Sequence, residues 1–140
     1  MATHYLWIPN IPGDSRTAPF EGWIALQSFQ QKSGTLQGNG MGGQGKLPSS
    51  LSFTALLGRA SQKLLQAMVQ GKNFDEALVG TPEGKGMHFQ LADVYVASYN
   101  VSGSSNLESF ELDFGKIKFL SDAEFFSLPV FQRAAVAKRR

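Results

Sequence analysis

The glycine-rich segment QGNGMGGQGKLPSS, residues 37–50, has the spacing in this sequence that comes nearest to a site for chemistry. Residues 38–43 fit G-x-G-x-x-G, a pattern in which glycines let the backbone approach a dinucleotide. Residues 40–46 fit all but the last position of G-x-x-x-x-G-K-[ST], the loop that cradles nucleotide phosphates. Phosphate binding is therefore the first hypothesis to test.

The residues that follow the segment argue against phosphate binding. A phosphate loop passes directly into a helix, whose N-terminal N–H groups face the anion. Here Lys46 is followed by Leu47, which removes the hydroxyl that would ligate magnesium, and then by Pro48. LSFT (residues 51–54) reads as a strand, and no helix is expected until about residue 61. We interpret the segment as a long, mobile connection between strands, because glycines cost backbone entropy to order.

The remaining residue types predict no catalytic, cofactor-binding or metal site. The chain has no cysteine, which excludes thiol catalysis and cysteine-bound zinc. His4 and His88 each fall on an expected strand, and two histidines alone do not make a metal site. Glu111 and Asp113 alternate on one strand face, a pattern that is typical of a solvated surface. No G-x-S-x-G elbow occurs in the sequence.

The composition is that of one globular domain spanning residues 1–140, with 42% hydrophobic and 17% charged residues. A net charge of +2 is too small to predict nucleic-acid binding. The start of the sequence lacks the pattern of a signal peptide, and no apolar run is long enough for membrane insertion. Residues 132–140 contain four basic side chains and are expected to form a flexible tail.

Hydrophobic periodicity predicts a mainly β protein of roughly seven strands. In ESFELDFGKIKF (residues 108–119), alternate apolar residues share one face until Gly115, after which the alternation shifts by one residue. MHFQLADVYVASYNV (residues 87–101) shows a similar shift near Asp93. A shift of this kind is typical of a β-bulge, and long bulged strands favour a small barrel or sandwich.

One flanking α-helix is predicted over about residues 61–70. Ser61 is the expected N-cap and Gly71 the expected left-handed C-cap. The face expected to pack on the core consists of Leu64, Leu65 and Met68.

The order of these motifs resembles the Hcp family, the tube protein of the bacterial type VI secretion system. The resemblance covers roughly residues 4–120. It rests on IPGDS, EGWIALQSFQ, the Met-Gly-Gly core of the glycine-rich segment, LSFT with a leucine-rich helix ending in Gly-Lys, and NLESFELDFGKIKF. These motifs are structural rather than catalytic.

The resemblance implies a small β-barrel with a flanking helix that assembles into homo-hexameric rings. The rings stack into a tube, a contractile sheath surrounds the tube, and a spike protein caps it. The tube is cytoplasmic before firing and is then secreted, sometimes with effector proteins in its lumen. The architecture is related to contractile phage tail tubes. Two alternatives stay open: a non-enzymatic small-barrel binding or tail-tube-like assembly module, and a nucleotide-using enzyme.

The resemblance also suggests that the glycine-rich segment is the loop by which one ring contacts the next. Five glycines in eight residues allow left-handed backbone and close approach of another chain. Lys46 would contribute a charge and Leu47 an apolar contact. The expected ring-stacking residues are Gly38, Gly40, Met41, Gly42, Gly43, Gly45, Lys46 and Leu47.

The C-terminal part, residues 121–140, departs from the family pattern. Family members usually end in a strand with a Gly-Trp-Asn or Gly-Trp-Asp type of sequence. This chain has SDAEFFSLPVFQRAAVAKRR there instead. We expect its apolar residues either to form an edge strand interrupted by Pro129 or to pack on a neighbouring subunit, which leaves closure of the barrel open.

Overall fold

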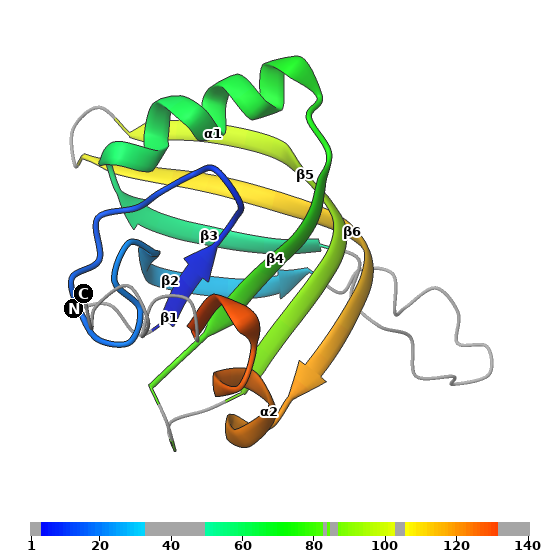
Figure 1. Cartoon of the computed structure of the whole chain (residues 1–140). Helices are drawn as coiled ribbons and strands as arrows, with labels where there is room; N and C mark the ends of the chain where they lie inside the picture. Colours follow the sequence, from blue (N-terminus) through cyan, green and yellow to red (C-terminus); the bar gives the residue numbers. More distant parts are fainter. Residues whose placement is uncertain (1–3, 33–49, 83, 85–86, 103–105, 132–140) are drawn as a thin grey trace.

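The computed structural model describes residues 4–32, 50–82, 84, 87–102 and 106–131 of the chain, and Figure 1 draws them in colour. The described strands form one closed antiparallel barrel in the order β1-β2-β3-β6-β5-β4. They are β1 (His4–Trp7), β2 (Ile24–Lys32), β3 (Ser50–Leu56), β4 (Phe74–Gly80), β5 (His88–Ser102) and β6 (Leu107–Leu120). The short strand β1 closes the barrel by pairing with β2 on one side and β4 on the other. The predicted mainly β barrel is confirmed, with six strands in the described residues rather than roughly seven.

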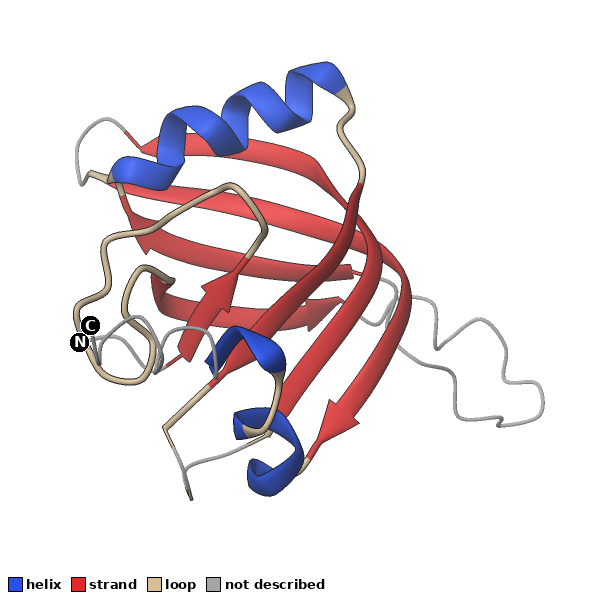
Figure 2. Ribbon diagram, viewed as in Figure 1, coloured by secondary structure: helices blue, strands red, loops and turns tan. Residues whose placement is uncertain are grey.

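The barrel interior is filled by side chains from all six strands and from helix α1 (Arg59–Gln70). Leu6, Leu26, Leu51, Leu91 and Leu112 are fully buried there. Figure 2 shows α1 and the second helix, α2 (Asp122–Phe126), at opposite ends of the barrel. Each of the two helices therefore covers a different part of the barrel.

Helix α1 begins two residues earlier than expected and buries a different face. Its N-cap is Gly58, and Ser61 lies in the first turn, where its Oγ accepts a hydrogen bond from the Gly58 N–H at 2.9 Å. The predicted C-cap is confirmed, because Gly71 has a φ of 64°. Leu64 is buried as expected and Met68 partly so, but the expectation for Leu65 is wrong, since 42% of that residue is exposed. The real core face consists of Ala60, Leu64 and Ala67.

In three neighbouring strands, the alternation of buried and exposed residues shifts by one position at the same row of residues. We call this row the crease: Asp75 on β4, Asp93 on β5 and Gly115 on β6. The buried residues on either side of this row are three positions apart in every strand: Phe74 and Ala77, Leu91 and Val94, and Phe114 and Ile117. The phase shifts predicted at Gly115 and near Asp93 are therefore confirmed. The crease bends three strands together, as the curvature of β5 and β6 in Figure 1 shows.

The crease does not shift the register between strands, unlike an ordinary β-bulge. Ala92 pairs with Lys116 on one side of it and Val94 with Phe114 on the other. The register shifts lie elsewhere, between Val96 and Ser98 on β5, and on β2. At the crease, the alternation of buried and exposed residues shifts by one position in both β5 and β6, so the pairing of these two strands is preserved through the bend.

Backbone and side-chain geometry explain the residue types at the crease. Asp93 has a φ of 61°, and its Oδ1 accepts a hydrogen bond from the Asn73 side-chain amide at 2.9 Å. Its carboxylate lies over Gly115, where an added Cβ would come within 2.9 Å of Asp93 Oδ2. A side chain at position 115 would therefore push the carboxylate of Asp93 out of place.

Residues 121–131 are largely helical and pack on the chain's own barrel, so the expected edge strand is wrong, whereas packing on a neighbouring subunit stays a prediction. Ser121 caps α2, because its Oγ accepts a hydrogen bond from the Glu124 N–H, and Glu124 Oε1 accepts one from the Ser121 N–H. Phe125 is fully buried, and a short helical turn follows over residues 129–131. This segment covers a second apolar cluster against β1, β2 and β4, which includes Tyr5, Trp23 and Leu78.

A histidine–carboxylate pair anchors α2 to the barrel. The buried His88 ring accepts a hydrogen bond at Nδ1 from the Thr81 N–H at 3.4 Å, so Nε2 carries the proton and donates it to Asp122 Oδ1 at 2.6 Å. This bond, with a weaker contribution from the Gly84 N–H, lowers the pKa of Asp122. The ring also stacks on Phe125 with centroids 4.2 Å apart. His88 thus has a structural role in this part of the fold.

The two adjacent leucines of α1 provide a direct test of its orientation. Leu64→Ala should lower the free energy of unfolding by about 2–5 kcal/mol, because it leaves a cavity in the core. Leu65→Ala removes an exposed side chain and should change stability by about 0.5 kcal/mol or less. Urea denaturation of the two variants measures both values. Equal losses would mean that the helix is rotated relative to this description.

The crease predicts an unusual order of stability at position 93. Asp93→Ala should cost about 1–2 kcal/mol, because a β-carbon stays at positive φ while the bond from Asn73 is lost. Asp93→Asn should come close to the parent, since asparagine tolerates this backbone and keeps an acceptor oxygen. Chemical denaturation compares the two. A parent-like Asp93→Ala protein would show that the bend does not depend on this side chain.

Candidate functional site

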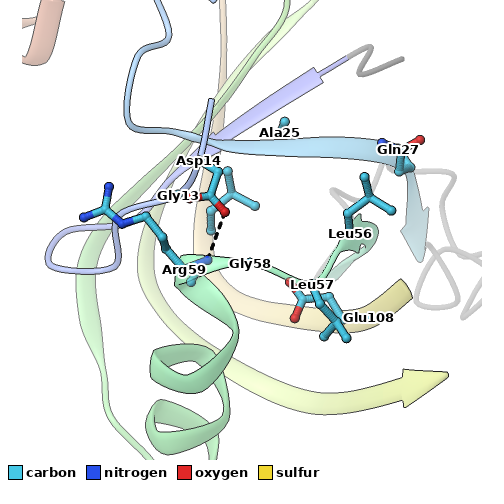
Figure 3. Close-up of a pocket in the computed structure, with 11 residues that line it drawn as sticks. Gly13, Asp14, Ala25, Gln27, Leu56, Leu57, Gly58, Arg59 and Glu108 are labelled. Carbon is cyan, nitrogen blue, oxygen red and sulfur yellow. Dashed lines mark hydrogen bonds between the residues drawn. The ribbon is translucent and has the colours of Figure 1, made fainter. Parts of the chain in front are cut away.

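A concave site among the described residues lies where α1 begins. It is a pocket of about 200 Å³ between the start of α1, the end of β3 and strand β2 (Figure 3). We call it the α1 pocket. It is lined by Gly13, Asp14, Ile24, Ala25, Gln27, Leu56, Leu57, Gly58, Arg59, Ala60 and Glu108.

The chain folds into this shape because Asp14 caps the helix from a distant part of the sequence. Its Oδ2 accepts a hydrogen bond from the Arg59 N–H at 3.0 Å, drawn as a dashed line in Figure 3. Gly58 permits this approach, because a Cβ there would lie 2.2 Å from the same oxygen. The negative charge also lies at the positive end of the helix dipole. The loop that carries Asp14 and the helix start are thus held together at one wall of the pocket.

The most unusual residue of the pocket is Glu108, a carboxylate that is 99% buried, with 1% of the residue exposed. It lies on the inward face of β6 with Phe110, Leu112 and Phe114. Its Oε1 accepts a hydrogen bond from the Tyr99 hydroxyl at 2.5 Å. Burial, together with the bond to Glu108, raises the pKa of Tyr99 to about 12, against a smaller opposing effect of a hydrogen bond with Ser61.

The charges of the α1 pocket are not balanced from within. No lysine, arginine or histidine among the described residues forms an ion pair with Glu108. Arg59 belongs to the lining, but Figure 3 shows its guanidinium directed away from Glu108. Asp14 adds a second negative charge. An acidic pocket of this kind is suited to binding a cationic group.

The rim of the pocket is apolar and exposed. Leu56 and Leu57, at the end of β3, are 57% and 40% exposed. Exposed apolar side chains of this kind are typical of residues that a protein–protein interface covers. The described residues contain no group of three or more His, Cys, Asp or Glu side chains that could hold a metal ion.

Sequence reasoning did not identify this pocket. The expected ring-stacking residues 38–47 lie outside the described residues, so the structure neither joins them to the pocket nor separates them from it. Of the expected helix face, only Leu64 and Met68 contact the core. Glu108 could have been found from its position, because it has the same parity as Phe110 and therefore shares the inward face of the strand.

The raised pKa of Tyr99 predicts how stability responds to alkali. The folded-state pKa of about 12 lies above the usual value of 10.0. This contribution to stability is therefore fully present below about pH 10 and is lost as the pH rises toward 12. Tyrosinate absorbance should show a late-titrating component in the parent that is lost in Tyr99→Phe. If the variant keeps the late component, another tyrosine is responsible.

Comparisons with known proteins relate this fold to one family. Residues 5–120 match the sequence profile of the family described as type VI secretion system effector, Hcp. Among curated proteins, no sequence matches the chain. No helix in the described part of the chain is both long and apolar enough to cross a membrane.

Solved structures of this family have the same fold. Hcp2 from Salmonella typhimurium superposes with a TM-score of 0.69 at 24% identity, covering 83% of each chain. Hcp1 from the E. coli EAEC 042 pathovar superposes with a TM-score of 0.70 at 21% identity, over 89% of this chain and 93% of that one. The secreted protein Hcp3 from Pseudomonas aeruginosa gives 0.64 at 16% identity, over 87% and 92%. Because the family profile matches the chain from β1 to the end of β6, the chain belongs to the Hcp family and is a type VI secretion tube protein.

Proposed function

We propose that the chain is a structural subunit of the type VI inner tube that forms six-membered rings. The rings stack into a tube that is expelled from the cell and is able to carry effector proteins. Its partners are further copies of itself, the spike at the tip and the contractile sheath. In this role the protein needs no cofactor and catalyses no reaction.

The observation that carries this proposal is the family match over the entire barrel, residues 5–120. The distribution of exposed apolar residues supports it. Such residues occur at the end of β3 (Leu56), on the outer face of α1 (Leu65 and Val69) and near the end of β6 (Phe119). A cyclic ring joins two different surfaces of each subunit, so exposed apolar groups on several elements are what a ring-former requires.

Stacking is assigned to the glycine-rich segment, residues 38–47, as a proposal that rests on the family resemblance. Ordering a glycine-rich loop costs roughly 1–2 kcal/mol per residue in backbone entropy. Contacts with the next ring must offset that cost, so isolated rings should stack weakly. Nucleation by a partner such as the spike would then favour growth of the tube.

The assembly proposal predicts a six-fold species in native mass spectrometry and light scattering at micromolar concentration. Joint replacement of Gly42 and Gly43 by valine should preserve folding and the six-fold ring but abolish tubes in negative-stain images and the protein in culture supernatant. The reason is that valine resists the left-handed backbone and close approach that glycine allows.

Two controls make the outcome clear. Lys46→Ala separates the two roles considered for the loop. If the loop is a phosphate site, this variant should lose ATP binding. If the loop stacks rings, the variant should only weaken the contact between rings. A parent that stays monomeric at tenfold higher concentration would refute ring formation. Normal tubes from the double valine variant would refute the stacking role while leaving the ring intact.

A further inference from the structure

We propose that the α1 pocket receives one arginine or lysine side chain from a neighbouring copy of the chain, with Glu108 as its acceptor. This inference rests on the proposed ring assembly and adds to it a specific contact between subunits. It places a buried charge pair beside the exposed apolar side chains of Leu56 and Leu57.

The first argument is the cost of burying Glu108. A carboxylate that is 99% buried loses its hydration and needs hydrogen bonds or an opposite charge in return. Tyr99 supplies one hydrogen bond, at 2.5 Å, to one of the two oxygens. A carboxylate can accept several more. Glu108 is therefore under-compensated within the described part of a single chain.

The second argument concerns the residues that could compensate it from within. The guanidinium of Arg59 points away from Glu108 in Figure 3, and its backbone N–H is already bonded to Asp14. Asp14 contributes a further negative charge to the same pocket. The cation that would complete the site must therefore come from outside the described residues of this subunit.

The third argument is the size of the pocket. A volume of about 200 Å³ is below the roughly 300–1,000 Å³ of typical small-molecule and cofactor sites. It suits the end of a single long side chain. Arginine matches a carboxylate with two parallel hydrogen bonds, and lysine matches it as a point charge.

A second copy of this chain is the occupant that the surroundings favour. The exposed rim residues Leu56 and Leu57 would be covered by the same partner that inserts the basic side chain. A buried charge surrounded by apolar contacts that exclude water is the common anatomy of an interface hot spot. The chain itself offers thirteen lysines and arginines against eleven acidic residues, so it can supply the donor.

The test compares Glu108→Gln with Glu111→Gln. Glutamine keeps an acceptor for Tyr99 but removes the charge, so folding should be preserved. Glu111 lies on the same strand but outside the pocket, and its substitution changes the net charge equally. The readout is the protein concentration at half-assembly, from light scattering and native mass spectrometry, with the thermal melting temperature as a check on folding.

We expect Glu108→Gln to raise the half-assembly concentration at least about tenfold, because the partner's cation would be left buried without its counter-charge. Glu111→Gln should stay close to the parent. If Glu108→Gln assembles like the parent while the parent forms rings, the inference is wrong and the proposed function stands. Equal weakening by both variants also overturns it, since a general charge effect would explain both.

If the parent does not assemble at all, the proposed function fails, and the pocket is then judged separately. Arginine methyl ester, with citrulline methyl ester as the uncharged control, is titrated while the backbone amides of Leu57 and Gly58 are followed by NMR. Saturable shifts in the parent that are lost in Glu108→Gln support a cation pocket. No shift, or equal shifts with citrulline ester, overturns it.

Double-mutant cycles identify the donor. Each of the thirteen basic residues is changed to glutamine alone and together with Glu108→Gln. The donor is the residue whose effect on half-assembly is large alone and nearly absent in the double variant. Additivity for all thirteen would exclude a second copy of the chain as the source of the cation.

Discussion

The bend across β4, β5 and β6 is the constraint on which the rest of this structure depends. β5 has fifteen residues and β6 has fourteen, too long to stay straight in a barrel that closes with only six strands. The bend must occur without loss of pairing, because unpaired backbone groups in the wall would be costly. The crease satisfies both demands, since Asp75, Asp93 and Gly115 shift the three strands together and preserve their register.

The crease also divides the long strands into two parts, whose side chains contribute to different regions of the structure. On one side, Glu108, Phe110, Leu112 and Phe114 face the interior, and Glu108 brings a carboxylate to the α1 pocket. On the other side, Ile117 still faces the barrel interior, while Leu120 joins the outer cluster that α2 covers. Because one bend determines both orientations, the position of Glu108 is linked to the position of the C-terminal helix.

The sequence was sufficient to predict the parts of the fold that depend on local alternation. Phe110, Leu112 and Phe114 are buried as their period of two indicates, and the shift after Gly115 is present. Alternation within one strand, however, carries no information about its neighbour. It could not show that the alternation of buried and exposed residues in β4 shifts at the same row. The sequence therefore predicted separate bulges where the strands bend together.

The errors in the helices have equally physical causes. In α1 the large residues Leu64 and Leu65 suggested the core face. The buried face instead combines Leu64 with the small residues Ala60 and Ala67, which allow the helix to approach the strands. At the C-terminus the aromatic residues near Pro129 suggested a strand. The capping pair Ser121 and Glu124, spaced as S-x-x-E, was the available signal for a helix there.

The C-terminal helix has a consequence for how the molecule can associate. The family match ends at residue 120, and the segment after it buries Phe125 completely and partly buries Phe126, Leu128 and Phe131 on the chain's own barrel. The side chain of Phe125 is consequently unavailable for contact with another subunit. The exposed apolar residues of the described chain include Leu56 and Leu57 beside the α1 pocket. Apolar contacts are non-directional, whereas a charge pair fixes register. In the proposed ring, the buried carboxylate of Glu108 would supply that directional element beside Leu56 and Leu57, where apolar contact alone would leave the register of two subunits undetermined.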